Sequence, residues 1–146
     1  MAASKLTVTI ACPVEDVFAA LTDVEKTHLW SAPAVEEHWT TPPPHGIGSR
    51  RHAVTQMLGR RTENDAEVTE YEPNRHWAMT SVSGPPFTVS ADFSPVAGGT
   101  RVDWTWSFDF TGPMRLASGP AAWMFGRLFA KDLARLKRLM ESGELG

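Results

Sequence analysis

Apolar and polar residues alternate at the start of the chain. The alternation over residues 6–12 predicts a strand with one buried face. An apolar stripe at three- and four-residue steps over residues 14–21 then predicts a helix. Thr22 and Glu25 have the spacing of a capping box, which favours a second short helix ending near Trp30. The chain is therefore expected to begin with one strand and two short helices.

Strands separated by turn signals are predicted from residue 35 to residue 110. The clearest turn is Gly98-Gly99, because both glycines can adopt the positive φ of a primed two-residue hairpin. This turn brings apolar faces together, whereas a slip of one residue would invert a strand's faces. The expected pairs are Phe93 with Trp104, Ala91 with Trp106, Val89 with Phe108, and Phe87 with Phe110.

A second hairpin turn is predicted at Pro73-Asn74. It also places apolar residues of two strands on one face of the sheet. The expected arrangement is Val68 opposite Met79, Ala66 opposite Ser81, and Trp77 on the same face.

The strand before Gly59 has two possible registers, because the length of the loop at this glycine is open. A two-residue loop directs one set of side chains to the core, and a three-residue loop directs the other. The first set, which we favour, is Arg51, Ala53, Thr55 and Met57, and the second is Arg50, His52, Val54 and Gln56.

A long helix is predicted near the end of the chain, over about residues 121–142. Apolar residues recur there at three- and four-residue steps from Phe125 to Met140. A helix with so wide an apolar surface needs an apolar partner, and the sheet face is the only large one available. These elements predict an α+β protein whose antiparallel sheet wraps around the C-terminal helix.

Composition narrows the class of protein. The 146 residues include 42% hydrophobic residues and a single cysteine, and the formal net charge is −3. The length fits one domain spanning residues 1–146. The charge argues against a protein that coats nucleic acid, and one cysteine excludes an internal disulfide. No apolar run reaches the roughly 18 residues of a membrane span, and no signal stretch begins the chain, so we expect a cytoplasmic protein.

Six segments carry a pattern that extends over nearly the whole chain: residues 10–23, Trp30, and residues 46–50, 68–73, 99–102 and 132–137. In these segments the chain resembles the START-related helix-grip (SRPBCC) superfamily, most closely its polyketide cyclase/dehydrase-like branch. The resemblance implies a curved seven-stranded antiparallel sheet in the order strand, two helices, six strands, helix. It also implies an apolar cavity between the sheet and the long C-terminal helix, suited to lipids, polyketides and other poorly soluble molecules.

We expect a ligand site between the sheet and the N-terminal half of the last helix, although ordinary core packing could also explain an aromatic face. Ser81 could donate a hydrogen bond there, and Arg51 could bind a carbonyl or carboxylate. Met114 would form part of the rim. The expected ligand-binding residues are Trp39, Arg51, Met57, Trp77, Met79, Ser81, Phe87, Val89, Ala91, Trp104, Trp106, Phe108, Met114, Trp123 and Met124.

Three histidines, His38, His45 and His52, recur at seven-residue steps. A hairpin centred on His45 would bring His38 opposite His52, as a metal site or a proton-transfer pair requires. No thiolate lies nearby and His45 would be at the loop tip, so we favour surface imidazoles and expect neither a metal nor a cofactor.

A basic stripe on the last helix is interpreted as its solvated outer face, because apolar residues occupy the opposite side. A surface that binds RNA, a membrane or a partner is the less favoured alternative. The stripe consists of Arg127, Lys131, Arg135 and Arg138, and Asp132 can pair with Arg135.

Cyclase chemistry would need a base that removes a proton α to a carbonyl, and donors that stabilise the enolate. The motifs contain no catalytic signature, so no catalytic residue is assigned. Asp109 falls on the polar face, and the only inward carboxylates are Glu37 and Glu70, near the ends of the sheet. The scarcity of bases favours binding or carriage of a small hydrophobic molecule. The alternatives are a cyclase/dehydrase using an inward Arg and a co-chaperone-like interaction module with a closed cavity.

Overall fold

A computed structural model of the chain describes residues 2–57, 59–108 and 118–145. The elements follow the predicted order of strand, two helices, six strands and helix. They are β1 (Ala2–Ile10), α1 (Val14–Thr22), the 3₁₀ helix η1 (Val24–Leu29), β2 (Ala34–Trp39), β3 (Arg50–Met57), β4 (Arg60–Glu72), β5 (His76–Ser83), β6 (Phe87–Val96), β7 (Gly99–Phe108) and α2 (Ser118–Glu141).

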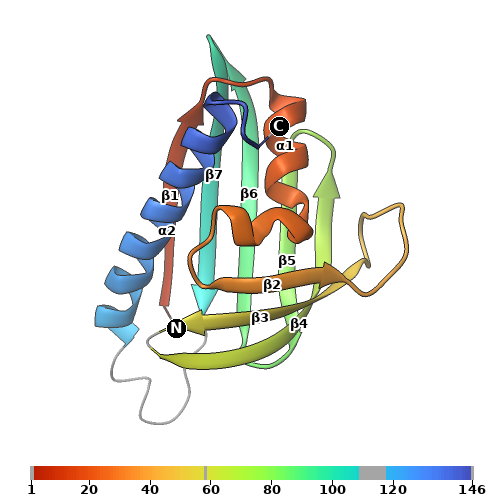
Figure 1. Cartoon of the computed structure of the whole chain (residues 1–146), viewed down its shortest axis with the longest axis vertical. Coiled ribbons are helices and arrows are strands. Elements are labelled where there is room, and N and C mark those ends of the chain that lie inside the picture. The colour runs from red at the N-terminus through yellow and green to blue at the C-terminus, as the bar shows by residue number, and fades with distance from the viewer. Residues whose placement is uncertain (1, 58, 109–117, 146) are drawn as a thin grey trace.

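The seven strands form one antiparallel sheet in the order β1-β7-β6-β5-β4-β3-β2. Figure 1 shows β2 and β3 crossing the direction of β5, β6 and β7 at a steep angle. The long strand β4 connects the two directions, and its pairing with β5 is irregular between Asp65 and Ala66 and between Val68 and Glu70. Such bulges bend a strand and increase its twist, which gives the sheet its curvature.

Helix α2 runs alongside β1, while α1 covers β6 and β7 at one end of the sheet (Figure 1). The buried side chains of α2, among them Leu133, Leu136 and Met140, join sheet residues in one hydrophobic core. This arrangement confirms the predicted α+β helix-grip fold. None of the described helices has the length and apolar character needed to cross a membrane.

The hairpin between β6 and β7 has a different register from the predicted one. Val96 pairs with Gly99, so the turn residues are Ala97 and Gly98, and the observed pairs are Phe93–Val102, Ala91–Trp104, Val89–Trp106 and Phe87–Phe108. The shift is two residues, and the apolar faces are therefore still those predicted. Gly98 supplies the positive φ of the turn. Gly99 is instead needed where the strand passes the end of β1, since a Cβ there would lie 2.2 Å from the carbonyl oxygen of Ile10.

The other predicted registers are confirmed where they can be compared. Val68 pairs with Met79 and Ala66 with Ser81. Met57 pairs with Arg60, so the loop at Gly59 has two residues and Arg51 faces the interior. The capping-box prediction is wrong in detail: Thr22 Oγ1 donates to the carbonyl of Phe18, and Asp23 caps η1 by accepting from the N–H of Glu25.

Candidate functional site

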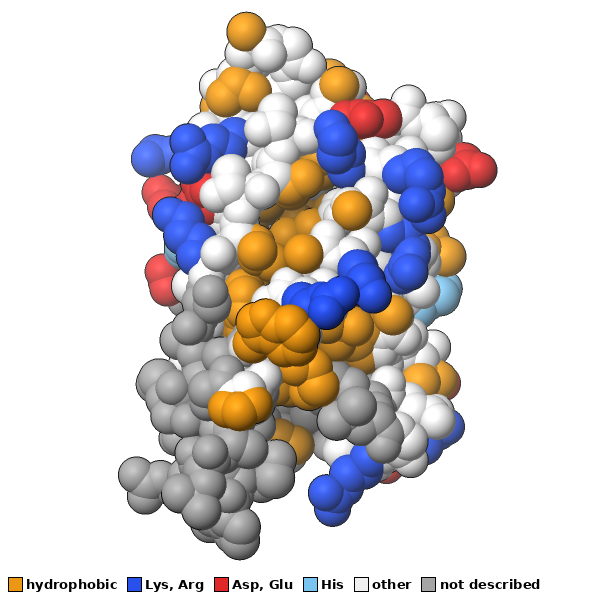
Figure 2. All heavy atoms as spheres, turned by 90° about the vertical axis from the view of Figure 1, so that its left-hand side faces the viewer, with side chains coloured by type: hydrophobic (Ala, Val, Ile, Leu, Met, Phe, Trp, Pro, Cys, Tyr) orange, Lys and Arg blue, Asp and Glu red, His pale blue; other side chains and the backbone are white. Residues whose placement is uncertain are grey.

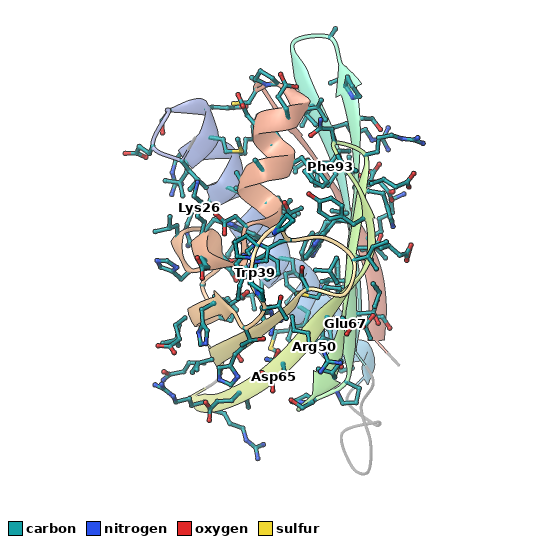
Figure 3. The ribbon with its side chains drawn as sticks, turned by 90° about the vertical axis from the view of Figure 1, so that its right-hand side faces the viewer. Lys26, Trp39, Arg50, Asp65, Glu67 and Phe93 are labelled. Atoms are coloured by element: carbon teal, nitrogen blue, oxygen red, sulfur yellow. The ribbon has the colours of Figure 1, made fainter. Side chains whose placement is uncertain are left out.

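Two hollows flank the interior. The first, of about 280 Å³, lies between the α1–η1 junction, the loop before β3 and the sheet. Figure 3 shows Trp39 between the helical segments and the sheet, where its ring stacks on His45 with centroids 4.0 Å apart. The residues lining this hollow are Ala19, Thr22, Asp23, Glu25, Trp39, His45, Gly46, Val68, Tyr71 and Trp77.

The second hollow, of about 520 Å³, lies between the N-terminal half of α2 and the segment joining η1 to β2. Its walls are Ala32, Pro33, Gln56, Trp123, Met124, Arg127, Leu128 and Lys131. Figure 2 shows hydrophobic side chains gathered on this side of the molecule, beside Lys and Arg side chains. Trp123 is 66% exposed and carries the Arg127 guanidinium over its ring, so it forms the outer wall of this hollow and does not belong to the buried aromatic core.

An aromatic cluster fills the interior between β6, β7 and α2. Trp104 and Trp106 point inward from β7 and are buried, and both rings contact Phe129 of α2. Phe108 stacks on Phe125 and Phe129 and also approaches Phe87. Side chains from β6, β7 and α2 therefore meet across the interior, which is the convergence that the sequence predicted.

Arg51 is the charged residue at the centre of the inward face of β3. Its side chain is 5% exposed, and its guanidinium lies 5.5 Å from the centroid of the Phe87 ring. One terminal nitrogen donates to both the side-chain and the backbone oxygen of Asn64. Burial lowers the pKa of Arg51, against the opposing effects of Glu37 and Asp65. Arg51 is thus held in place by β4 and covered by an aromatic ring.

Glu37 lies beside Arg51 and is buried with it. Its side chain is 9% exposed, and Oε2 is 3.4 Å from Nε of Arg51. Burial raises the pKa of Glu37 to about 7, although the positive charge of Arg51 acts in the opposite direction. A carboxyl group with this pKa is present in both protonation states at neutral pH.

Four buried N–H donors of the interior have no acceptor within the described part of the chain. They are the indole Nε1 groups of Trp30, Trp104 and Trp106, and Nε of Arg51. Trp30 and Trp104 make an edge-to-face contact, so two of the indoles are neighbours. Leaving a buried donor without an acceptor costs about 1–3 kcal/mol, which is why native interiors contain few of them.

Asp132 connects α2 to the rim of the second hollow. It is 1% exposed, and its two oxygens accept from Oγ of Ser31 and the N–H of Ala32. Arg135 is 3.8 Å from Asp132 and donates to the carbonyl of Trp30. Burial raises the pKa of Asp132, while these hydrogen bonds and Arg135 lower it. The pair therefore fixes residues 30–32 against the helix.

The three histidines lie in different surroundings: His38 is exposed and His52 is half-buried, whereas His45 lines the first hollow. His38 pairs with His52 across β2 and β3, as predicted, and their rings are 5.6 Å apart. His52 is hydrogen-bonded to Asp65 and Glu63. In residues 2–57, 59–108 and 118–145 no group of three or more His, Cys, Asp or Glu residues could hold a metal ion.

We expect His52 to make stability depend on pH. Its hydrogen bonds to Asp65 and Glu63 raise the pKa of His52 above 6.5 in the folded state. The stabilisation of the folded state by protonated His52 is fully present below the unfolded-state pKa, and it is lost as the pH rises through the folded-state pKa. The loss of unfolding free energy in His52→Gln, measured by urea titration, should therefore be larger at about pH 6 than at about pH 9. An equal loss at both pH values would contradict the prediction.

Comparison with known proteins decides the family. The family described as polyketide cyclase/dehydrase and lipid transport matches residues 1–141. The chain belongs to this family. "Uncharacterized protein Rv2574" of Mycobacterium tuberculosis (strain ATCC 25618 / H37Rv) is 29% identical over 138 residues, which are 90% of this chain and 78% of that protein.

Solved structures agree with the assignment. DR_A0006 from Deinococcus radiodurans is 20% identical, with a TM-score of 0.73 over 98% of this chain and 99% of that one. StfQ, a di-domain ARO/CYC from the steffimycin biosynthetic pathway, is 12% identical, with a TM-score of 0.79 over 97% of this chain and 51% of that one. At these identities the likeness shows the shared helix-grip fold of the family.

The residues predicted for the site occupy three places in this polyketide cyclase/dehydrase family member. Trp39 and Trp77 line the first hollow, and Trp123 and Met124 line the second. Between them lie the buried or half-buried residues Arg51, Met79, Phe87, Val89, Ala91, Trp104, Trp106 and Phe108. Ser81 Oγ accepts from the N–H of Phe87. Met114 and the side chain of Met57 lie outside the described residues.

Asp132, Asn64 and Trp30 are buried, although the sequence pattern predicted no interior role for them. A signal existed for Asp132, which follows Phe129 by three residues and precedes Leu136 by four, and so falls on the apolar stripe of α2. Asn64 is buried because it pairs with Ala53 on the inward face of β3. This family member therefore has more polar groups inside than its sequence pattern suggested.

Proposed function

We propose that this protein binds or carries a small hydrophobic molecule that bears oxygen acceptors, in the interior between the sheet and the N-terminal half of α2. The observation that carries the proposal is the set of four buried N–H donors for which the described residues provide no acceptor. An aromatic ligand with carbonyl or hydroxyl oxygens could accept from these donors while its rings contact Trp104, Trp106 and Phe129.

The second hollow supports the proposal as a route to the interior. Its lining includes the apolar side chains of Pro33, Met124 and Leu128, and Met124 and Leu128 also pack against the hydrophobic core. A ligand that enters here reaches the aromatic cluster by displacing side chains of α2 rather than strands of the sheet. Such a path is consistent with the described family, whose name includes lipid transport.

The direct test is native mass spectrometry of the protein purified from its own host. We expect a small molecule to co-purify with the protein. After this molecule has been removed, the fluorescent naphthalene dye ANS should bind to the protein. Leu128→Trp places an indole in the wall of the second hollow and should slow the association of ANS, measured by stopped-flow fluorescence, at least about tenfold, since the new ring obstructs the route. Ala134→Trp adds the same ring at an exposed position of α2 and should leave the association rate unchanged.

Two outcomes would contradict the proposal. If no molecule co-purifies and ANS does not bind, the interior is closed and an interaction module is the better description. If Leu128→Trp and Ala134→Trp associate with ANS at the same rate, the ligand does not pass through the second hollow.

A further inference from the structure

The first hollow lies apart from the route of the proposed function. Within the described residues the two hollows share no lining residue, and the first is bounded by the α1–η1 junction, the loop before β3 and the sheet. Its volume of about 280 Å³ is at the lower end of the range for ligand pockets and suits a small molecule. A ligand of this hollow would therefore have a site of its own, whose chemistry is set by its own walls.

Three aromatic side chains line the sheet side of the first hollow. Trp39 extends from β2, Tyr71 from β4 and Trp77 from β5. Trp39, which Figure 3 shows between the helical segments and the sheet, is half-buried, as is Tyr71, and Trp77 is buried. The face of an aromatic ring carries negative electrostatic potential, so rings of this kind attract a cation that comes within about 6 Å of them.

The helical side of the first hollow carries two negative charges. Asp23 and Glu25 line it from the start of η1, and within the described residues neither carboxylate has a Lys, Arg or His partner. Asp23 accepts from the N–H of Glu25, and Glu25 accepts from the N–H of Trp39, each through one oxygen. These hydrogen bonds position both carboxylates without neutralising them. The described lining also contains no Lys or Arg, so the charge of the hollow is uncompensated from within.

His45 adds an acceptor to the same hollow. Its Nε2 lies 3.2 Å from the carbonyl oxygen of Thr41, and since a carbonyl only accepts, this nitrogen carries the hydrogen. In the neutral ring Nδ1 is then an acceptor. The hydroxyl of Thr22, which also lines the hollow, already donates to the carbonyl of Phe18. The walls therefore offer ring faces, carboxylates and an imidazole acceptor, which is the chemistry that receives a positive charge.

We propose that the first hollow is a binding site for a small organic cation, namely a protonated or quaternary amine. The positive charge lies beside Asp23 and Glu25, and the methyl or methylene groups around it contact Trp39, Tyr71 and Trp77. An anion would face two carboxylates at close range, and a neutral molecule of the same shape would lose the attraction of both the carboxylates and the rings. This site goes beyond the proposed function, which concerns the interior and the second hollow.

The test compares choline with 3,3-dimethyl-1-butanol, in which a carbon atom replaces the nitrogen. The two molecules have nearly the same shape, and only choline is charged. Proton NMR follows the broadening of the methyl signal of each ligand as wild-type protein is added, and gives the dissociation constant. We expect choline to bind at least about tenfold more tightly than the alcohol, because only the cation is attracted by the rings and the carboxylates.

Two variants of the site test the charge and the ring, at about 0.15 M salt so that distant charges are screened. Asp23→Asn removes one charge but keeps a side chain that can cap η1, and should weaken choline binding at least about fivefold. Its control is Asp16→Asn, at an exposed position of α1 outside the lining, which should leave the affinity unchanged. Trp39→Leu should also weaken binding at least about fivefold, whereas Trp123→Leu, in the second hollow, should not.

Equal affinity of the wild-type protein for choline and the alcohol, or binding of neither, would overturn the cation site. The proposed function would then stand, because its ligand uses another part of the molecule. Equal choline affinity in either matched pair, Asp23→Asn with Asp16→Asn or Trp39→Leu with Trp123→Leu, would place the cation elsewhere and would also overturn the site. Should Asp23→Asn not fold, Glu25→Gln takes its place with the same expected loss.

Discussion

Replacing Gly99 with alanine is expected to destabilise the protein by about 3 kcal/mol. The added Cβ would lie 2.2 Å from the carbonyl oxygen of Ile10 and 2.9 Å from Cα of Ala11, so backbone must move at the junction of β1 and β7. For a domain of this size the midpoint of thermal unfolding should fall by roughly 10 °C. Circular dichroism during heating measures the change.

Gly98 provides the matched control, since it is the adjacent glycine of the same hairpin. Its φ is +80°, and no heavy atom lies within 4 Å of a Cβ built there. Asparagine tolerates this backbone conformation, so Gly98→Asn should cost no more than about 1 kcal/mol. If the two variants lose equal stability, the turn conformation and not the close approach to β1 explains the need for glycine.

Replacing Trp106 with alanine is expected to lower the free energy of unfolding by about 3–5 kcal/mol. The side chain is 1% exposed and contacts Phe129, so truncation removes a large buried surface and leaves a cavity between β7 and α2. Equilibrium unfolding in urea measures the loss, which should appear as a lower midpoint at an unchanged slope.

Trp123→Ala is the control for this truncation, because it removes the same side chain from the surface. Trp123 is 66% exposed and its described ring contact is with Arg127, so the expected loss is below about 1 kcal/mol. If both variants lose a similar amount of unfolding free energy, α2 packs on the sheet through Trp123, and Trp106 is not at the centre of the core.

The alternation of apolar residues predicted the faces of the strands correctly, although the register of the clearest hairpin was wrong by two residues. Two adjacent glycines fit a primed turn, and local turn chemistry favoured Gly98 and Gly99 together. The structure assigns Gly99 to a close approach between β7 and the end of β1. A contact between segments about ninety residues apart leaves no mark on the local pattern. Because the side-chain period of a strand is two, the error changed the partners and not the faces.

In the candidate site, too, some residues could be placed from the sequence and others could not. Arg51 could be placed inside from the loop at Gly59, and the inward aromatics could be placed from alternation. The exposure of Trp123 could not be predicted, because a helix position beside an apolar stripe is buried only if another element covers it. In this structure Trp123 is exposed. Glu37 was recognised as inward, yet its burial beside Arg51 depends on the curvature of the sheet, which folds β2 and β3 across the other strands (Figure 1).

By itself the sequence determined the order of the elements, the apolar face of each strand and the helix-grip family, because these depend on residue spacing within single segments and on motifs spread along the chain. Only the tertiary structure decided which polar groups are buried together. Burial, a raised pKa and a donor without an acceptor arise where separate strands and helices meet, and the distances that produce them are fixed by packing of the whole chain.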